Sequence, residues 1–504
     1  MKTIGIIGAS LIGTGITYNL IMADFTIYLI DISNDKLGKA IHNIKLHLEE
    51  ATKADLINQD DIKKKLNSIK SSTKLEDIPA NIDLVIECVP EDINIKTSVF
   101  NTLDKVCNKN TIFATNTSSI SVTKLSKSTT RPDKFIGIHF IPPTETNELI
   151  ELIPIETTSK ETLSIIEKFA ERIEKITIIS KDSPGFCLNR FLLPILNEAA
   201  ILVDTNKYRN EIYTINYALK DAFKAPSGPF EIMNAIGTTY TYKASNELAQ
   251  ELGDFYRPCE FLKEQAQNNT LWDLPEINKY KDMEAAAFHD TPEIKKMFQG
   301  IVFGVCTKLV EEKIASITDI NLAAKIGLGW QYGPFEAIND YGPSKTAYLI
   351  EEYANNNIYL PVVKNIEDID NWPIYTTKYY TENNTSFIKL NRPDKTNSIN
   401  KSLLIELNKH LNTAISDENS KVIVITGSPG CFSTGIDTDY FITSLRRNRI
   451  EDITNFIKLA QSTFNKIAES TKPIIALVDC ITHSAGLELA QSCHFIISTE
   501  SSTF

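Results

Sequence analysis

The sequence predicts three successive parts: an α/β part built on a parallel sheet, a helical part, and a second α/β part. In residues 1–181, short apolar runs that suit buried strands alternate with segments of helical spacing. Turn-forming residues at 182–186 (Asp-Ser-Pro-Gly-Phe) end this alternation, and the apolar spacing beyond them is helical. Strand-like runs return from Phe387. Such an order is typical of a chain with several domains of different class.

The composition is that of a large globular protein. The chain has 504 residues, 42% hydrophobic and 23% charged, without an apolar run long enough to span a bilayer. This length predicts about three to four domains. The formal net charge of -12 argues against a general nucleic-acid-binding surface, which would be basic. We therefore expect neither a nucleic acid nor a membrane as partner.

The cysteines and the N-terminal segment indicate the compartment. Eight cysteines are scattered without a CxxC pair or a Cys/His cluster at metal-ligand spacing, so we expect no metal site. Isolated cysteines in a large chain fit a reducing compartment, which predicts a cytoplasmic protein. Residues 4–23 resemble a signal peptide in hydrophobicity, but four glycines and Asn19 interrupt them and favour a strand, a turn and a helix.

Residues 3–31 have the pattern of a dinucleotide-binding unit. A strand at 3–7 precedes Gly-Ala-Ser-Leu-Ile-Gly at 8–13, then a helix to about Met22, a strand at 26–30, and Asp31. The first glycine permits a tight turn, the last permits close helix–strand packing, and the helix N-terminus faces a pyrophosphate. Asp31 would bind ribose hydroxyls and repel a 2′-phosphate, which predicts NAD. The cofactor-binding residues expected here are Gly8, Ser10, Leu11, Ile12, Gly13 and Asp31, with Ser10 in place of the usual middle glycine.

Three later strands carry polar groups. After a segment at 34–75 that we predict to be helical, strands are expected at 84–89, 112–114, 135–138, 149–153 and 177–180. Ser118 follows the second of these, His139 ends the third, and Glu151 interrupts the fourth. Because ligands bind beyond the carboxyl ends of parallel strands, we expect these three side chains at one rim. Taken alone, each residue has a structural alternative. Ser118 would cap a helix, His139 would be a hydrogen-bonded histidine of the core, and Glu151 would be a solvated carboxylate.

The helical part contains an internal repeat. Gly-Pro-Phe-Glu occurs at 228–231 and again at 333–336, each after a similar helical pattern, which favours a duplicated module over coincidence. We predict an internal dimer-like pair of modules, or else a homodimer. The predicted domains are residues 1–181, 182–275 and 276–360, a linker at 361–384, and residues 385–504.

Several motifs of the first two parts resemble those of the 3-hydroxyacyl-CoA dehydrogenase family. They are DLVIECVPEDINIK at 83–96, TNTSS at 115–119, IGIHF at 136–140, ELIELIP at 148–154 and SPGFCLNR at 183–190. The resemblance implies a Rossmann-type NAD-binding domain followed by helical domains like the C-terminal domain of 6-phosphogluconate dehydrogenase. It implies oxidation of a 3-hydroxyacyl-CoA thioester with NAD.

The resemblance also implies roles for individual residues. His139 is the general base, Glu151 orients its imidazole, and Ser118 and Asn189 hydrogen-bond to substrate oxygens. Glu91 and Lys96 match positions that contact the cofactor near its ribose. Ser118 is also expected to contact the cofactor. Pro142 departs from the family, which has at this place an asparagine that helps to hold the cofactor.

Residues 385–504 resemble the N-terminal half of the crotonase (enoyl-CoA hydratase/isomerase) fold, a ClpP-like α/β fold. The matching strings are IKLNRPDKTNSIN, VIVITGSPGCFSTGID and KPIIALVDCITHSAGLELAQSCHF. The resemblance implies an oxyanion hole formed by the amides of Ile436 and Ala485, with Glu488 as the first catalytic glutamate. The family's second glutamate would lie beyond Phe504, so we expect an incomplete hydratase site.

The sequence thus predicts a 3-hydroxyacyl-CoA dehydrogenase fused to part of an enoyl-CoA hydratase. The alternative is a catalytically impaired protein that binds a dinucleotide or acyl-CoA, because Ser10 and Pro142 both depart from the family on the cofactor side. A lyase acting alone is a third possibility, and it conflicts with the expected lack of a second glutamate.

Overall fold

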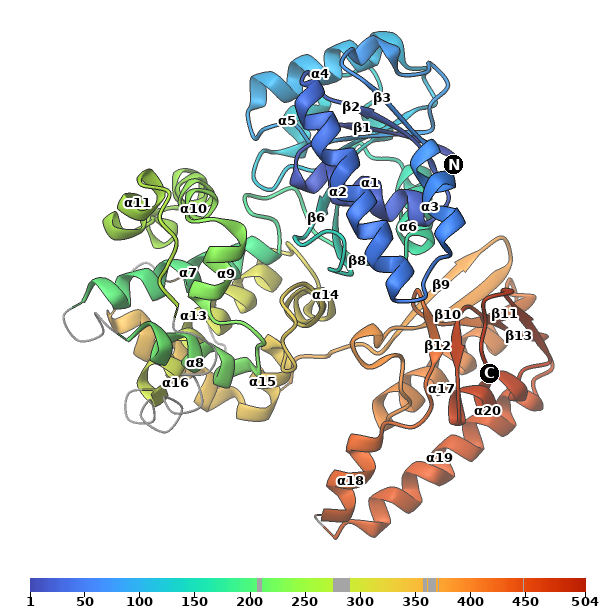
Figure 1. Cartoon of the computed structure of the whole chain (residues 1–504). Helices are drawn as coiled ribbons and strands as arrows, with labels where there is room; N and C mark the ends of the chain where they lie inside the picture. The colour runs from blue at the N-terminus through green and yellow to red at the C-terminus, as the bar shows by residue number, and fades with distance from the viewer. Residues whose placement is uncertain (206–210, 275–290, 357–359, 361–368, 370, 447) are drawn as a thin grey trace. The chain divides into compact units, whose positions relative to one another are not determined.

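The computed structural model describes residues 1–205, 211–274, 291–356, 360, 369, 371–446 and 448–504. The chain forms two compact units: unit 1 is Met1–Ile173 with Thr177–Trp372, and unit 2 is Glu174–Ile176 with Pro373–Phe504. The predicted boundary at 275–276 and residues 361–368 of the predicted linker lie outside the described residues. Figure 1 shows the elements of both units, which are described separately below.

Unit 1 begins with an eight-stranded sheet in the order β3-β2-β1-β4-β5-β6-β7-β8. Its strands are β1 (Thr3–Ile7), β2 (Thr26–Ile30), β3 (Ile69–Ser72), β4 (Leu84–Glu87), β5 (Ile112–Thr115), β6 (Phe135–Phe140), β7 (Leu149–Pro154) and β8 (Ile176–Ile179). The helices among them are α1 (Leu11–Met22), α2 (Asn34–Lys53), α3 (Gln59–Asn67), α4 (Ile93–Val106), α5 (Val122–Ser126) and α6 (Lys160–Arg172). Strands β1, β4, β5 and β6 are buried almost throughout, as expected for parallel strands covered on both faces.

Two features of this sheet differ from the prediction. Strand β3 lies within the segment predicted to be helical; it is a half-exposed edge strand, so its sequence carries no alternation of buried residues. Strand β7 runs antiparallel to β6. The connection between them, residues 141–148, is too short for the crossover of about a dozen residues that a parallel pair needs.

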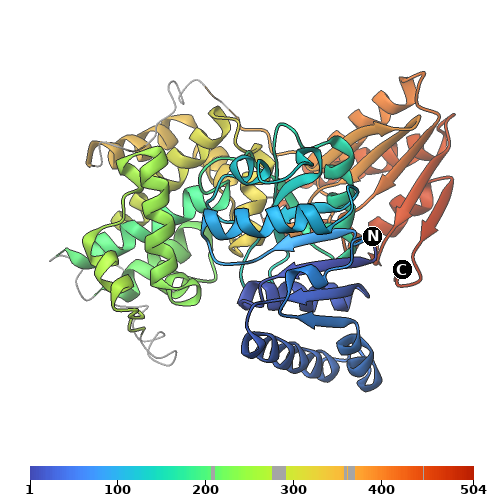
Figure 2. The same ribbon diagram turned by 90° about the horizontal axis from the view of Figure 1, so that it is seen from above.

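The rest of unit 1 is a bundle of helices, coloured green to light orange in Figure 2. Its helices are α7 (Leu188–Asp204), α8 (Ile212–Phe223), α9 (Pro229–Ile236), α10 (Thr238–Leu252), α11 (Glu260–Gln267), α13 (Thr291–Glu311), α14 (Ile317–Leu322), α15 (Pro334–Tyr341) and α16 (Pro343–Asn356). Helix α13 packs against α7, α8 and α16 and so ties the two halves of the bundle together (Figure 1).

The two halves repeat the same hydrogen bonds. Asn216 Oδ1 accepts from the backbone amide of Phe230 at 3.0 Å, and Asn321 Oδ1 accepts from that of Phe335 at 2.8 Å. Both bonds fix the start of a Gly-Pro-Phe-Glu helix against the helix before it. Because identical side chains make identical bonds at equivalent places, the repeat extends well beyond the four-residue string and indicates a duplicated module.

An asparagine clamp is also repeated. Asn234 accepts from the amide of Trp272 at 2.8 Å and donates to its carbonyl at 2.9 Å. Asn339 makes the same two bonds to Trp372, both at 2.8 Å. Each clamp fastens the segment that follows a module onto the module's third helix.

The modules pack on each other through aromatic rings and backbone bonds. Phe223 stacks on Trp330 with ring centroids 4.3 Å apart. The amide of Gln331 donates to the carbonyl of Lys224 at 3.3 Å, and that of Tyr332 to the carbonyl of Phe223 at 3.1 Å. The end of the first module's second helix is thus bonded to the loop before the second module's α15.

Unit 2 has a five-stranded sheet in the order β15-β13-β11-β10-β9 and a two-stranded sheet β12-β14. The strands are β9 (Thr377–Glu382), β10 (Thr385–Leu390), β11 (Val422–Thr426), β12 (Cys431–Ser433), β13 (Ile474–Val478), β14 (Ile481–Thr482) and β15 (Phe495–Ser498). The helices are α17 (Lys401–Ser416), α18 (Thr438–Arg446), α19 (Ile450–Ala468) and α20 (Ala485–Ser492).

Strand β9 lies in the segment that the sequence predicts to be linker. It forms an antiparallel hairpin with β10 through Asn383 and Asn384, whose φ angles are 47° and 61°. Two residues with positive φ are what a two-residue hairpin turn requires, and asparagine adopts this conformation more readily than most residues. The Asn-Asn pair is therefore the sequence signal for β9.

Among the described helices, none combines the length and the apolar character that a membrane span requires. Within the same residues, no three His, Cys, Asp or Glu side chains gather in a way that could hold a metal ion.

We expect the two asparagine clamps to act locally and equivalently. Asn234→Ala removes both bonds to Trp272 and should destabilise that attachment by about 1–3 kcal/mol, because the backbone groups lose their partners. Hydrogen exchange measured by mass spectrometry should then accelerate in the peptide around Trp272 and not in the peptide around Trp372. Asn339→Ala should give the reverse pattern. Equal acceleration of both peptides in either variant would contradict the local role.

Candidate active site

His139 and Glu151 face each other across two neighbouring strands. They are a directly opposed residue pair in the β6–β7 ladder, and His139 Nδ1 lies 2.6 Å from Glu151 Oε2. Both side chains are buried. A hydrogen on Nδ1 that is donated to the carboxylate leaves Nε2 as the nitrogen able to accept a proton. The pair therefore has the arrangement of a base and the carboxylate that orients it.

The second oxygen of Glu151 binds the start of the helical part. Glu151 Oε1 accepts from the backbone amides of Cys187 at 3.0 Å and Leu188 at 3.1 Å, where α7 begins. Amides at a helix N-terminus carry partial positive charge and favour a carboxylate. This bonding places Asn189, the next residue, beside the His139–Glu151 pair.

Asn189 contacts a side chain outside the predicted set. Its Nδ2 donates to Tyr240 Oη at 3.2 Å. Asn189 comes from α7, Tyr240 from α10 and Ser118 from the loop after β5. The structure thus adds Tyr240 to the neighbours of the predicted residues, and no sequence motif marks this tyrosine.

Glu91 holds the loop that carries Ser118. Glu91 Oε1 accepts hydrogen bonds from the amides of Ser118 and Ser119, both at 3.1 Å, from the hydroxyl of Ser119 at 3.0 Å and from the hydroxyl of Thr117. One carboxylate therefore sets the backbone of residues 117–119. Lys96 Nζ lies 3.2 Å from the other Glu91 oxygen.

Lys96 is the centre of a buried charge cluster. Its ammonium donates to Glu87 Oε1 at 2.8 Å and Oε2 at 3.0 Å and to the carbonyl of Val89 at 3.2 Å. Burial would lower the pKa of Lys96, but Glu87 and Glu91 outweigh it and raise that pKa. Burial would likewise raise the pKa of Glu91, and Lys96 with the hydroxyl donors holds it below its usual value. Lys96 therefore binds Glu87 and Glu91, and Glu91 in turn holds the loop that carries Ser118.

The first turn of the sheet fits a dinucleotide. Gly8 has φ +109°, and a Cβ there would lie 2.6 Å from the carbonyl oxygen of Cys88, so only glycine fits. A Cβ at Gly13 would lie 2.0 Å from the carbonyl oxygen of Gly8, so α1 packs closely on this turn. Within the described residues, the amides of Leu11 and Ile12 at the start of α1 have no protein acceptor, which leaves them for an anion.

Ser10 and Asp31 stabilise this turn through hydrogen bonds and do not distort its backbone. Ser10 has φ -72° and ψ 177°, an extended conformation open to any residue, and its hydroxyl caps α1 by accepting from the amide of Gly13 at 3.2 Å. Asp31 accepts from the amides of Ala9 and Ser33, both at 2.9 Å. The serine is therefore compatible with the backbone of a dinucleotide site.

Pro142 lies in the loop 141–148 and offers no hydrogen-bond donor. The loop is held instead by other side chains: Asn19 Nδ2 donates to the carbonyl of Thr144 at 2.7 Å, and Asn116 Oδ1 accepts from the amide of Phe140 at 2.8 Å. These bonds fix the start and the middle of the loop that follows His139.

In unit 2, two backbone amides lie on adjacent loops. Among the described residues, neither Ile436 N–H nor Ala485 N–H has an acceptor. Strands β12 and β14 pair just before these residues, and the amide of His483 donates to the carbonyl of Ser433 at 3.0 Å. A Cβ at Gly435 would lie 2.7 Å from Cβ of Ser484, so the two loops are in close contact. Two free amides in this arrangement suit an oxyanion.

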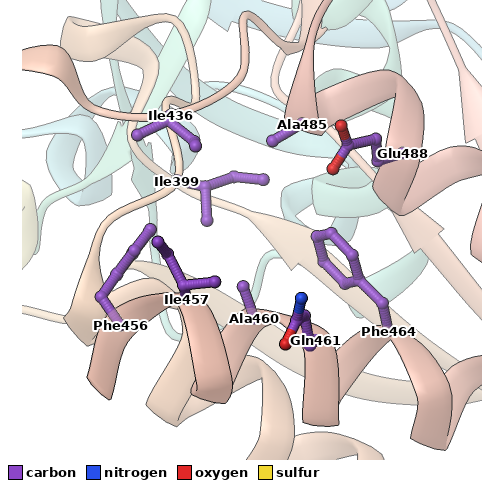
Figure 3. A pocket seen from close by; sticks show the side chains of 9 residues that line it. All are labelled: Ile399, Ile436, Phe456, Ile457, Ala460, Gln461, Phe464, Ala485 and Glu488. Carbon is purple, nitrogen blue, oxygen red and sulfur yellow. The ribbon is translucent and has the colours of Figure 1, made fainter. Parts of the chain in front are cut away.

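The amides border an apolar pocket, shown in Figure 3. Its lining residues come from α19, α20 and the loops before α17 and α18: Ile399, Ile436, Phe456, Ile457, Ala460, Gln461, Phe464, Ala485 and Glu488. The Glu488 carboxylate points into the pocket opposite the side chains of α19 (Figure 3). The arrangement provides an apolar wall, two hydrogen-bond donors and one carboxylate, which is what a thioester with an acyl chain requires.

Three family profiles match the chain in order. They are the NAD-binding domain of 3-hydroxyacyl-CoA dehydrogenase at residues 3–183, the C-terminal domain of the same enzyme at 185–273, and enoyl-CoA hydratase/isomerase at 380–504. They agree with the predicted order of an NAD-binding, a helical and a crotonase-type domain.

Individual relatives give the same result. The chain is 35% identical over 263 residues to a 3-hydroxybutyryl-CoA dehydrogenase of Bradyrhizobium diazoefficiens, covering 52% of the chain and 89% of the relative. It is 28% identical over 377 residues to a fatty acid oxidation complex subunit alpha of Vibrio parahaemolyticus, covering 70% of the chain and 53% of the relative. A 3-hydroxybutyryl-CoA dehydrogenase structure from Escherichia coli has the same fold, with a TM-score of 0.62 and 19% identity, covering 73% of this chain and 98% of that one.

The first of these relatives aligns over most of its own length at substantial identity, and the cofactor turn, the His139–Glu151 pair and Asn189 all lie in the region that matches. The chain therefore belongs to the 3-hydroxyacyl-CoA dehydrogenase family, and it carries an enoyl-CoA hydratase/isomerase domain on the same polypeptide.

Proposed function

We propose that unit 1 is an NAD-dependent (3S)-3-hydroxyacyl-CoA dehydrogenase, which interconverts a 3-hydroxyacyl-CoA and a 3-oxoacyl-CoA. The observation that carries this proposal is the buried His139–Glu151 pair, 2.6 Å apart, with Asn189 directly after the Cys187 and Leu188 amides that bind Glu151. The substrate in this proposal is an acyl-CoA thioester, in line with the family and with the relatives' activities.

His139 takes up the proton of the substrate's 3-hydroxyl group at Nε2. Glu151 supports this step in two ways: it fixes the ring through Nδ1, and its negative charge stabilises the imidazolium that forms. Burial of both groups keeps water away from the transferred proton and strengthens the attraction between them.

Ser118 and Asn189 are assigned to the oxygen atoms of the substrate. Both side chains are neutral hydrogen-bond donors, so they can polarise a carbonyl without neutralising the base. They approach from different elements, the loop after β5 and helix α7, and this fixes the substrate's orientation as well as its position.

The turn at Gly8 and the free amides of Leu11 and Ile12 would hold the pyrophosphate of NAD, and Asp31 would bind the hydroxyls of its adenine ribose. When bound, its nicotinamide supplies the hydride chemistry. Glu91 and Lys96 contribute by holding the Ser118 loop, which borders this part of the site.

For unit 2 we propose binding of an enoyl-CoA thioester and its hydration. Ile436 and Ala485 hold the thioester oxygen through their amides, and Glu488 acts on the water. The product of hydration is a 3-hydroxyacyl-CoA, the substrate proposed for unit 1.

We further propose that the two helical modules form an internal pair in place of a homodimer, supported by the Phe223–Trp330 stack between them. A reducing compartment such as the cytoplasm fits the eight cysteines, which are all free thiols.

Replacement of His139 tests the dehydrogenase. The intact chain should oxidise NADH with acetoacetyl-CoA, and His139→Ala should lower kcat by about 10²–10⁴-fold, as expected for loss of a general base. His42→Ala, an exposed histidine on α2, is the matched control and should keep full activity. Wild-type rates in His139→Ala would remove His139 as base. Binding of NADH without turnover of any 3-oxoacyl-CoA would favour a protein that binds and does not catalyse.

Replacement of Asp31 tests the choice of cofactor. The wild type should prefer NADH, because a 2′-phosphate would lie against the Asp31 carboxylate. Asp31→Asn removes the charge and keeps an oxygen that can accept one of the bonds from Ala9 and Ser33. The ratio of kcat/KM for NADPH to that for NADH should rise by about tenfold or more, since a charge pair near the surface is worth a few kcal/mol. An unchanged ratio would contradict this role.

Replacement of Ala485 tests the oxyanion hole of unit 2. Ala485→Pro removes the amide hydrogen at the first position of α20, where proline is well tolerated. A chromophoric enoyl-CoA, whose absorption moves to longer wavelength when its carbonyl is hydrogen-bonded, should show a smaller shift on this variant than on the wild type. Ser484→Gly, which keeps both amides, is the control and should retain the shift. Equal shifts on all three proteins would exclude Ala485 as a donor.

A further inference from the structure

Phe186 packs its ring against the imidazole of the proposed base. The ring centroids of Phe186 and His139 are 5.9 Å apart and the ring planes are inclined by 57°, within the range found for packed aromatic rings. The Phe186 side chain is fully buried. The imidazole of His139 therefore has two different neighbours, a carboxylate at Nδ1, which belongs to Glu151, and an aromatic ring.

The same ring belongs to the apolar cluster on the sheet face that carries the catalytic pair. Side chains two residues apart in a strand share a face, so Phe135 lies on the face of His139 in β6, and Ile153 lies on the face of Glu151 in β7. Phe135, Ile153 and Phe186 are members of one buried hydrophobic cluster. The polar pair thus lies at the end of an apolar row, and Phe186 connects the imidazole to this cluster.

The backbone at Phe186 is strained. Its φ is 49°, and Gly185 before it has a φ of 71°. Glycine adopts this left-handed region freely, but a bulky side chain rarely does. The turn is closed by the amide of Phe186, which donates to the carbonyl of Ser183 at 2.9 Å. A conformation of this kind costs free energy and persists only where the surrounding contacts hold it.

The contacts that hold this turn are those with the catalytic pair. Directly after Phe186, the amides of Cys187 and Leu188 donate to Glu151 Oε1 at 3.0 and 3.1 Å. Three consecutive residues thus contact both members of the pair: a ring lies against the imidazole of His139, and two amides bind the carboxylate. The strained residue is therefore the one whose side chain meets the base.

We propose that Phe186 is a positioning residue of the dehydrogenase: its ring keeps the imidazole of His139 aligned with Glu151 and keeps water from the bond between them. This inference rests on the proposed function. A single hydrogen bond leaves an imidazole free to rock about its side-chain torsions, whereas a ring packed against it restricts this motion. Because an aligned base needs no reorganisation when it takes up the proton, the benefit falls on the chemical step and not on substrate binding.

Phe186→Leu keeps an apolar side chain and removes the aromatic ring. With acetoacetyl-CoA and NADH, we expect kcat to fall by about tenfold, since misplacing a reacting group costs up to about 10²-fold. The KM for acetoacetyl-CoA and the affinity for NADH should change little. Phe100→Leu is the matched control, because Phe100 is fully buried in the same cluster, where it contacts the rings of Phe113 and Phe135. It should lower the melting temperature to a similar extent and leave kcat unchanged.

Phe186→Gly removes the ring and keeps the turn. Glycine adopts a positive φ without strain, so the amides of Cys187 and Leu188 should stay bound to Glu151 and the chain should fold. The kcat of this variant should be lower than that of Phe186→Leu, again with little change in KM. A wild-type kcat in either Phe186 variant would overturn the inference, and so would an equal loss of kcat in Phe100→Leu.

A double-mutant cycle separates positioning from a general structural role. If Phe186 acts through His139, Phe186→Leu should cause little further loss of kcat in a His139→Ala background. Losses of the same size in the two backgrounds would overturn the inference. A wild type that binds NADH and reduces no 3-oxoacyl-CoA would overturn the proposed function and this inference with it. An active wild type whose Phe186→Leu variant is unaffected would overturn the inference alone.

Discussion

The carboxylate of Glu151 is the interaction on which the arrangement of unit 1 depends. One oxygen binds the imidazole of His139 and the other binds the amides of Cys187 and Leu188, so a single buried side chain joins two strands of the sheet to the first helix of the bundle. Burying a carboxylate costs several kcal/mol of lost hydration unless hydrogen bonds replace the water. Glu151 has three such partners: the imidazole of His139 and the amides of Cys187 and Leu188. His139 and Asn189 are therefore tied to each other through Glu151.

The duplicated helical module supports the same region from the other side. Asn147 Nδ2 donates to the carbonyl of Gly327 at 2.8 Å, and the amide of Lys181 donates to the carbonyl of Ile314 at 2.8 Å. Both acceptors belong to the second module, and the donors lie just before β7 and just after β8. The first module thus contributes side chains to the site, whereas the second fastens the strands that present it. The two modules therefore have the same internal hydrogen bonds but different contacts with the sheet.

Local signals in the sequence predict much of this structure. The glycine turn before α1, the apolar runs of the buried strands and the repeated Gly-Pro-Phe-Glu strings each reflect a constraint within a short stretch of chain. The antiparallel direction of β7 was not predicted, because an apolar run carries no information on strand direction, although the short loop 141–148 does. Tyr240 was not found either, since its bond to Asn189 depends on α10 lying against α7, and no local pattern encodes that contact.

The two proposed sites offer donors of different kinds, and this affects which sequence changes they would tolerate. The site proposed for unit 1 relies on side chains, so Ser118 and Asn189 would be needed for their chemistry. The site proposed for unit 2 relies on backbone amides, so the identity of Ala485 would matter only for its size and its backbone conformation. The limit there is Ser484, whose φ of 52° lies in the region that favours glycine, at a cost of about 1–3 kcal/mol. The pairing of β12 with β14 and the contact with Gly435 hold this residue in place, so unit 2 keeps its two free amides although a serine occupies this position.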